Sequence, residues 1–565
     1  MAGAAIPPRR APTRPGDDPV AAMPARQRLF DNGVNTVTFT AAEAPPPPGA
    51  GRALAVTFDP FRDLEVERPG FGETVLTRAG VDVLAVQKRR ENWYQDISRE
   101  AFAAGFGARI AAYERVLFYG SSAGAYAALY FARPFAAHVL AISPRASIHP
   151  SYAAHERARA RWGASFRHAA LEEGENRTLG TVLVYDPRLT ADTLMADDMR
   201  YLEREILGAY PAAARLPIPY SGHPSARMLA DAGLLKPLLF GCLAGKPLPD
   251  LLPDLPWRAA RGRSPSHLLQ LGRALLRHRR PAAAAAMCER ALALRSDQAE
   301  LFQLLAQIRQ VLQDKPGALA ALRQAVRLSP AAVAPRLRLV QLLRGQGGME
   351  EAIALLREGL ALAPEQPQMG AALLEMLRLR CERRMREGAV EEARADAREA
   401  LAILGSEDDP ADPGEALLHR SGLLAALGRQ EEALEAAAAA CAAAPGRARH
   451  HTHHAKLLLR AGELPRAREA AEAVVRLAPE SAASHRLLGE VLSRMQLRAE
   501  AVEAAENALR HEPGNPRLHE YLLLMLKKAG RTEEAEAARE RAIAAGLALP
   551  GQAARPAGLR PSAGN

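Results

Sequence analysis

Apolar residues follow two different patterns in the two halves of this chain of 565 residues. In the first half, short apolar runs of strand character alternate with helical stretches. The predicted strands are 53–58, 81–87, 116–119, 139–143, 181–185 and 216–220, and the predicted helices are 72–78, 98–113 and 123–133. This alternation predicts a mostly parallel sheet covered by helices on both faces, with any site at the carboxyl ends of the strands.

The second half repeats itself. A small residue opens the second helix of each predicted unit, at Ala284, Ala318, Ala352, Ala393, Ala433, Ala467, Ala501 and Ala535. The steps between them are 34, 34, 41, 40, 34, 34 and 34 residues. Many units close on a proline, at Pro330, Pro364, Pro445, Pro479 and Pro513. Small residues let paired helices approach and proline ends the second helix, so about eight helix–turn–helix units are predicted over 265–548.

Composition marks the segments around these two regions. Residues 1–48 are rich in Pro, Arg and Ala and are predicted to be disordered, although 35–40 has strand character. The stretch 246–264 contains four prolines and is predicted to be a linker between a domain at 50–245 and the repeats. A disordered tail is predicted over 549–565, and Glu407 to Pro410 are expected in a widened connection between repeats.

Charge and cysteine content narrow the functional classes. A net charge of +10 is modest for this length, so no nucleic-acid partner is expected. The four cysteines are far apart and form no C-x-x-C pair, which predicts neither disulfides nor a zinc site. The chain shows no signal-peptide pattern and no long apolar run, so no membrane span is expected. A cytoplasmic protein without cofactor or metal is predicted.

The motif Gly120-Ser121-Ser122-Ala123-Gly124 stands between a predicted strand and a predicted helix. A serine on such a tight turn has a strained backbone, so small residues are needed two positions before and after it. The turn exposes the hydroxyl of Ser122 as a candidate nucleophile and places the N–H of Ala123 where it can hold an oxyanion. The alternative is a glycine-rich turn without chemistry.

The order of elements over 50–245 resembles the α/β-hydrolase fold, in which nucleophile, acid and histidine follow each other along the chain. Ser122 follows one strand and His223 follows the last strand. The resemblance implies that His223 takes the proton of Ser122 and that an aspartate orients the imidazole. Asp186 ends its strand directly, whereas Asp192 has the spacing to His223 that the family favours. Asp192 is preferred and Asp186 is retained.

The same resemblance implies a second oxyanion donor after the first of these strands, the backbone N–H of Phe58 or Asp59. Three further residues on the same edge are substrate-pocket candidates. Arg89 lies in a basic turn that either attracts an anionic substrate or is simply solvated. The rings of Trp93 and Tyr94 either stack on a sugar or acyl group or fill the core.

The 34-residue unit resembles the tetratricopeptide repeat, which implies an all-α superhelical solenoid that binds a protein partner in its concave groove. His450 and His454 share one face of a first helix. They are interpreted as partner contacts in the groove rather than metal ligands, because no carboxylate or cysteine accompanies them.

These observations lead to competing hypotheses. The first is a serine hydrolase or acyltransferase, esterase-like, whose repeats bind a protein partner or a polymeric substrate. The second is a catalytically inactive hydrolase-like domain in a protein-interaction scaffold. A third rests on a loose resemblance to bacterial hydrolase-like proteins linked to surface-glycan assembly, for which Trp93 and Tyr94 would suit a glycan.

Overall fold

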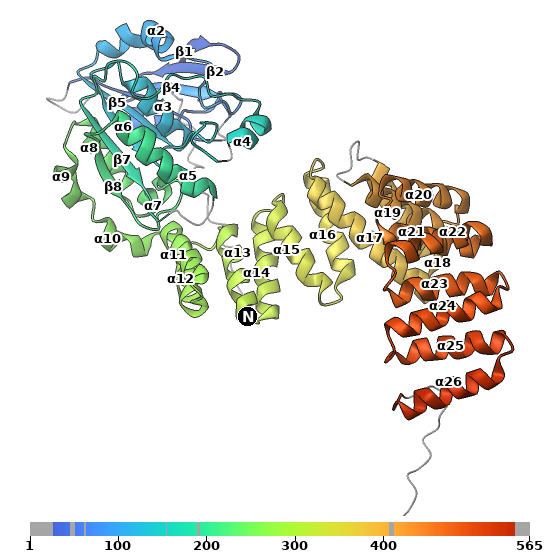
Figure 1. Cartoon of the computed structure of the whole chain (residues 1–565). Helices are drawn as coiled ribbons and strands as arrows, with labels where there is room; N and C mark the ends of the chain where they lie inside the picture. Colours follow the sequence, from blue (N-terminus) through green and yellow to red (C-terminus); the bar gives the residue numbers. More distant parts are fainter. Residues whose placement is uncertain are drawn as a thin grey trace, which may run out of the picture. The chain divides into compact units, whose positions relative to one another are not determined.

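The computed structural model describes residues 26–45, 51–61, 64–153, 155–188, 193–405 and 412–547. The chain divides into two compact units, Met1–Leu328 and Ser329–Asn565. The first unit contains the sheet and the first helices of the repeats, and the second unit contains helices alone. Figure 1 labels the elements of both units along the chain.

The first unit is organised around one sheet of eight strands in the order β1-β2-β4-β3-β5-β6-β7-β8. The strands are β1 Arg26–Asp31, β2 Asn35–Thr40, β3 Ala53–Phe58, β4 Asp82–Lys88, β5 Arg115–Ser121, β6 His138–Ile142, β7 Gly180–Tyr185 and β8 Ala214–Pro217. β2 runs antiparallel to both β1 and β4, and the remaining neighbours are parallel. The strand character predicted at 35–40 is confirmed as β2, whereas the prediction of disorder over 1–48 is wrong for β1, which is ordered by pairing with β2.

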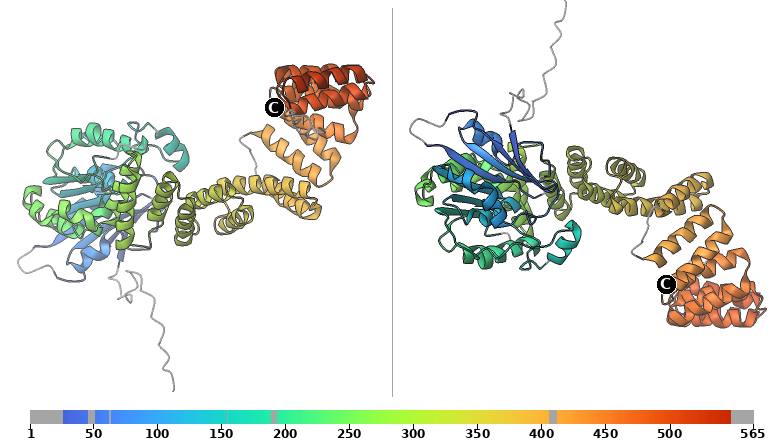
Figure 2. Two further views of the ribbon diagram at one scale, coloured as in Figure 1. Left: turned by 90° about the horizontal axis from the view of Figure 1, so that it is seen from below. Right: turned by 90° about the horizontal axis from the view of Figure 1, so that it is seen from above.

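Helices cover both faces of the sheet, as Figure 2 shows. In chain order the helical segments are α1 Glu73–Arg78, α2 Arg99–Ala111, α3 Ala123–Ala132, α4 His155–Trp162, α5 Thr193–Tyr201, the π-helix Leu202–Ile206, α6 Leu207–Ala209, α7 Ala226–Asp231, α8 Leu235–Leu243, α9 Leu248–Leu251 and α10 Trp257–Ala260. Side chains of one strand alternate between the faces. In β3, Val56 and Phe58 pack with α2 and α3, whereas Ala55 packs with α1 and α8. The result is two apolar cores, one on each side of the sheet.

The segment 246–264, predicted as a linker, is packed onto the sheet. Leu248, Leu251 and Leu255 are buried in the same core as the helix α8. The Ser264 hydroxyl donates to Asp231 Oδ2 at 3.0 Å, which ties the end of the segment to α7. The prolines thus shape short helical turns that bury leucines, and the two compact units divide later, after Leu328.

The helices of the repeats follow in eight consecutive pairs. Two pairs lie in the first unit: α11 Pro265–Arg277 with α12 Pro281–Leu294, and α13 Ala299–Val311 with α14 Lys315–Leu328. The second unit holds α15 Val333–Arg344, α16 Met349–Leu362, α17 Pro367–Glu387, α18 Val390–Gly405, α19 Pro413–Ala426, α20 Gln430–Ala443, α21 Ala448–Ala461, α22 Leu464–Leu477, α23 Ala482–Arg494, α24 Arg498–His511, α25 Pro516–Lys528 and α26 Thr532–Ala544.

The eight alanines of the 34-residue pattern are all buried, with at most 3% of each exposed. Each opens the second helix of a pair, where a small side chain lets the two helices approach. The first widened step is explained by α17, which is 21 residues long where α15 has 12. Glu407 to Pro410 and the tail at 549–565 lie outside the described residues.

Candidate active site

Ser122 stands on a strained turn between β5 and α3. Its backbone has φ 57° and ψ −120°, in the region that favours glycine. A Cβ at Gly120 would lie 2.2 Å from the carbonyl oxygen of Gly124, and a Cβ at Gly124 would lie 2.2 Å from that of Phe58. Both glycines are therefore sterically required, which is the physical reason for the small-residue spacing in the sequence. The N–H of Ser122 donates to the carbonyl of Ile142 at 2.9 Å and holds the turn against β6.

His223 lies on the segment after β8 and faces Ser122. The distance between Ser122 Oγ and His223 Nε2 is 2.9 Å. Burial, with a smaller effect of the nearby Arg145 charge, holds the pKa of His223 well below its ordinary value. The imidazole is therefore neutral at pH 7, and its Nε2 lone pair accepts the hydrogen bond from the serine hydroxyl.

The carboxylate beside His223 belongs to Asp198 on α5. Asp198 Oδ2 lies 3.5 Å from His223 Nδ1. The same carboxylate accepts hydrogen bonds from Arg145 Nε at 2.8 Å and from the Tyr152 hydroxyl at 3.0 Å, both at Oδ1. Burial raises the pKa of Asp198, and the bonds from Arg145 oppose that shift. Arg145 also donates its backbone N–H to the carbonyl of Ser122 at 3.1 Å, so one residue links Asp198 to the serine turn.

Asp186, a predicted candidate for the acid, has another role in this arrangement. Its carboxylate accepts the backbone N–H groups of Arg188, Tyr220 and Gly222 at 2.9, 3.0 and 2.8 Å. Two of these donors lie within the three residues before His223, so Asp186 holds the loop that carries the imidazole. The preferred candidate Asp192 lies outside the described residues.

Sequence reasoning missed Asp198 because it sought an acid near the end of a strand. Asp198 instead lies within a helix, 12 residues after Asp186. The Asp197-Asp198 pair is a visible acidic feature of the sequence, but one that commonly marks a solvated helix face. Asp198 is buried, with 8% exposed.

The predicted oxyanion donors differ in whether their N–H groups are free to donate. Ala123 is the first residue of α3, where a helix leaves its N–H groups without an acceptor inside the helix. The N–H of Asp59 donates to the carbonyl of Val86 at 3.4 Å, which corrects its predicted role. Phe58 is the last residue of β3 and is paired in register with Val86 of β4 and Gly120 of β5, and a role of its N–H as a donor stays a prediction. The turn itself therefore presents the N–H of Ala123.

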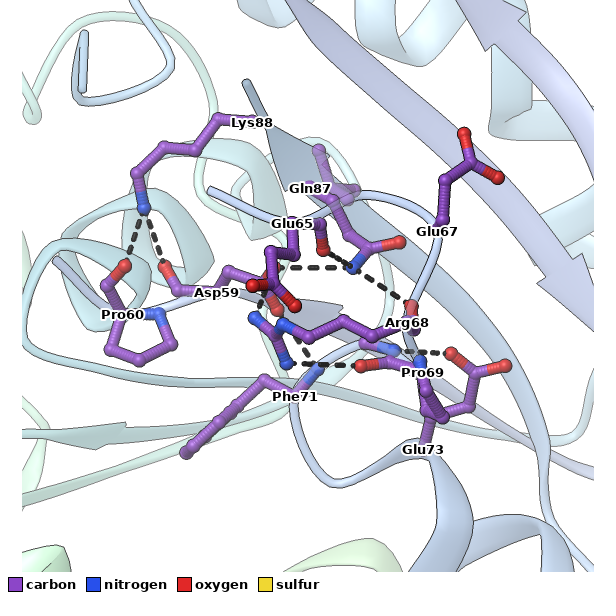
Figure 3. A network of polar contacts seen from close by, with 12 residues as sticks. Asp59, Pro60, Glu65, Glu67, Arg68, Pro69, Phe71, Glu73, Gln87 and Lys88 are labelled. Atoms are coloured by element: carbon purple, nitrogen blue, oxygen red, sulfur yellow. Dashed lines mark hydrogen bonds and ion pairs between the residues drawn. The ribbon is translucent and has the colours of Figure 1, made fainter. Parts of the chain in front are cut away.

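The loop after β3 is held by a network of buried polar groups, drawn in Figure 3. Lys88 Nζ donates to the carbonyls of Pro60 at 2.5 Å and Asp59 at 3.2 Å. Gln87 Nε2 donates to Asp59 Oδ2 at 3.3 Å, and Arg68 contacts the same oxygen at 3.2 Å. These charged and amide groups fix the loop that packs against the serine turn.

Two of the three predicted substrate-pocket residues are buried in the core. Trp93 and Tyr94 are 1% and 0% exposed. Trp93 packs on Phe61 with ring centroids 5.4 Å apart, so the rings fill the core. Arg89 forms two hydrogen bonds with Asp31, at 2.6 and 2.8 Å, and is engaged at the surface. The core alternative therefore applies to Trp93 and Tyr94, whereas a substrate role of Arg89 stays a prediction.

A small hollow borders His223. It has a volume of about 20 Å³ and is lined by Ser143, Tyr185, Asp186, Asp198, Leu202 and others beside His223. That volume admits about one water molecule. The loop that carries His223 contacts the first repeat helix, since a Cβ at Gly222 would lie 2.8 Å from Gln270 of α11. The repeats thus brace the histidine loop within the first unit.

The predicted groove histidines are also placed differently. His450 is fully buried, with Nδ1 3.1 Å from the carbonyl oxygen of Ala440. His454 does not line the groove of the second unit, whereas its neighbour His453 does. A helix rotates by about 100° per residue, so the consecutive residues His453 and His454 point in different directions. This corrects the prediction for His450, which is buried, whereas partner contact by the half-buried His454 stays a prediction.

Among the described residues, no group of three or more His, Cys, Asp or Glu side chains is arranged to hold a metal ion. Within the described helices, none combines the length and apolar character needed to cross a membrane.

Comparison with known proteins identifies the repeats. Residues 304–367 and 453–494 match the tetratricopeptide repeat family model. Similar solved structures include YrrB, titled a TPR protein with an unusual peptide-binding site, at 19% identity over 37% of this chain and 100% of that chain, with a TM-score of 0.29. MamA 41-end from Desulfovibrio magneticus RS-1 is 22% identical over 30% and 93%, with a TM-score of 0.25. A tetratricopeptide repeat protein from Parabacteroides merdae ATCC 43184 is 16% identical over 46% and 98%, with a TM-score of 0.31.

A search of curated proteins found no match. The sheet of the first unit is thus followed by a long helical solenoid of tetratricopeptide type, as the 34-residue period predicted.

Proposed function

We propose that the first unit is a serine hydrolase or acyltransferase of the α/β-hydrolase type, acting on an ester-type bond. Ser122 is the nucleophile, His223 the general base and Asp198 the acid of this proposal. The observation that carries it is the 2.9 Å contact between Ser122 Oγ and His223 Nε2 on a strained strand-to-helix turn. The order serine, aspartate, histidine along the chain is that of α/β-hydrolases.

In the proposed reaction, Ser122 Oγ attacks the ester carbonyl carbon while His223 Nε2 takes the hydroxyl proton. The N–H of Ala123 donates to the oxyanion of the tetrahedral intermediate. When the intermediate collapses, His223 returns the proton to the departing alkoxide and an acyl-serine remains. Water completes a hydrolysis, and an acceptor alcohol completes an acyl transfer. Asp198 orients Nδ1–H and offsets the charge of the imidazolium.

Arg145 makes this proposed triad unusual. Its guanidinium donates a hydrogen bond to the Asp198 carboxylate, and this bond helps to keep the buried carboxylate ionised. The same positive charge opposes protonation of His223.

The repeats provide the second part of the proposal. Stacked tetratricopeptide units form a continuous surface that suits a protein partner or a polymeric substrate. Because α11 contacts the loop that carries His223, we propose that partner binding to the repeats can shift this loop and with it the proposed base. No described residue favours the glycan link, since the rings of Trp93 and Tyr94 are buried.

One observation favours the alternative, an inactive hydrolase-like domain in an interaction scaffold. The hollow beside His223 holds only about 20 Å³, far less than the several hundred Å³ of an ordinary ligand pocket. Ser122 itself is 5% exposed. A scaffold would retain the turn for its structural fit alone.

Labelling with a fluorophosphonate probe distinguishes an active serine hydrolase from an inactive scaffold. The full-length protein and its Ser122→Ala and Ser121→Ala variants are compared, with a known serine hydrolase labelled alongside. Ser121 is the matched control, because its hydroxyl is buried next to Ser122 and has no hydrogen-bond partner in the described structure. We expect labelling of the wild type and of Ser121→Ala and none of Ser122→Ala. A folded wild-type protein that stays unlabelled supports the scaffold instead.

A further inference from the structure

The second unit contains a hollow of about 600 Å³ on the first helices of three successive repeats. Its walls come from α17, α19 and α21, which are labelled in Figure 1. A volume of this size is within the range of pockets that bind small ligands or short peptide segments. It is thirty times the hollow beside His223.

The walls of this groove are strongly cationic. Arg449, Lys456 and Arg460 project from α21, and Arg378 and Arg386 project from α17. The lining contains one carboxylate, that of Glu382, against these five cations. Its two histidines add no charge at pH 7, because burial lowers the pKa of His419 and brings that of His453 to about 4. The groove therefore carries a local excess of four positive charges.

The cations differ in how far they are already engaged. Arg378 forms an ion pair with Glu382, and Arg449 pairs with Glu415 at 2.5 Å. Lys456 and Arg460 are exposed, lie one helical turn apart, and form no hydrogen bond or ion pair with any residue the structure describes. These two charges remain available to a ligand.

The floor of the groove is apolar and open. Leu418, Leu423 and Ala426 line it from α19 together with Gly422. A Cβ added at Gly422 would meet only His453, at 3.9 Å, so the floor has space above the glycine. Met385 contributes from α17 and is 40% exposed, so its apolar side chain is accessible to a ligand. Such a floor suits one or two apolar side chains of a ligand.

We propose that this groove binds an acidic segment of a partner protein, with an apolar side chain over Gly422 and carboxylates at Lys456 and Arg460. The inference rests on the partner-binding part of the proposed function and is independent of the hydrolase part. Charge complementarity of this kind steers association and excludes partners of the wrong sign. The apolar floor supplies the anchor that charge alone does not.

A nucleic acid fits the groove less well. Surfaces that bind single strands stack bases on aromatic rings. None of the residues that line this groove is Trp, Tyr or Phe. The combination of leucines, a glycine floor and cations is that of a peptide site.

The test uses the full-length chain and a phage-displayed library of random short peptides. Selection is run on the wild type, on Lys456→Glu/Arg460→Glu, and on Arg510→Glu/Arg539→Glu. The control pair changes the net charge equally on exposed residues of α24 and α26, outside the groove. We expect Asp and Glu to be enriched on the wild type and the control, and the enrichment to vanish on the groove variant.

The affinity of each protein for a synthetic copy of the most enriched peptide is then measured. We expect the groove variant to bind it at least about tenfold more weakly, and added salt to weaken wild-type binding. Gly422→Met keeps every charge and fills the floor, so it is expected to weaken the same peptide. Peptides without acidic enrichment, equal binding by both charge variants, or stronger binding of an oligothymidylate overturn the inference. If no peptide is captured at all, the partner-binding part of the proposed function fails with it.

Discussion

Replacing Gly124 by alanine tests whether the serine turn is as tightly built as its geometry indicates. Gly124 lies two residues after Ser122, at the start of α3, with the end of β3 directly against it. An added Cβ would lie 2.2 Å from the carbonyl oxygen and 2.9 Å from the carbonyl carbon of Phe58. Both are backbone atoms, and the loop that follows Phe58 is held by the network around Asp59.

The size of the effect follows from the overlap. Real Cβ atoms essentially never approach closer than 3.0 Å, so helix and strand must separate by at least 0.8 Å. Overpacking of this kind costs about 1–3 kcal/mol of folding free energy. A displacement of roughly 1 Å at a reacting group costs about 100-fold in rate. Labelling of Ser122 is therefore expected to slow by about two orders of magnitude while the protein still folds.

The assay measures the rate of fluorophosphonate labelling and the midpoint of denaturant unfolding on the same samples. Gly105→Ala is the matched control, because Gly105 is exposed within α2 and its added Cβ would meet nothing within 4 Å. This second substitution is expected to stabilise the protein by up to about 1 kcal/mol and to leave labelling unchanged. Wild-type stability and labelling in Gly124→Ala would refute the steric reasoning, and slower labelling in Gly105→Ala would refute its assignment to the turn.

Two other predictions follow from the polar groups near the site. Asp198→Asn is expected to slow labelling by about 10²–10⁴-fold, since the amide favours the wrong imidazole tautomer. Asp186→Asn is expected to cost about 1–3 kcal/mol of stability, because it weakens the hydrogen bonds to the His223 loop. If Asp186→Asn slows labelling more than Asp198→Asn does, Asp186 is the acid. His168 has its pKa lowered to about 4 by burial, with Nδ1 2.7 Å from the Tyr126 hydroxyl. Because the unfolded chain binds a proton that the folded chain does not, unfolding free energy should fall as pH drops from about 6.5 toward 4, by up to about 3 kcal/mol. Denaturant titrations should show a flatter pH dependence in His168→Gln, and equal slopes would contradict this account.

The sequence alone determined those features that depend on neighbouring residues or on a fixed period. The turn around Ser122 is specified by five consecutive residues, because the clash that demands glycine occurs within the turn and with the strand beside it. The repeats are visible because each unit needs a small residue where its two helices touch, and Ala318 and Ala467 are both fully buried there. His223 was found from its order after the last strand.

Other features were decided only when distant segments packed together. Asp198 reaches His223 from within α5, and no local pattern distinguishes it from an aspartate on a solvated helix face. Trp93 is a core residue because it packs on Phe61, which the sequence does not place beside it. His450 turned inward while Lys456 remained exposed, because rotation along α21 assigns each residue a side and the neighbouring helices decide which side is buried. Burial and the partner of a polar group are properties of the packed molecule, since they depend on which surfaces meet, whereas turns and periods arise from the chain itself.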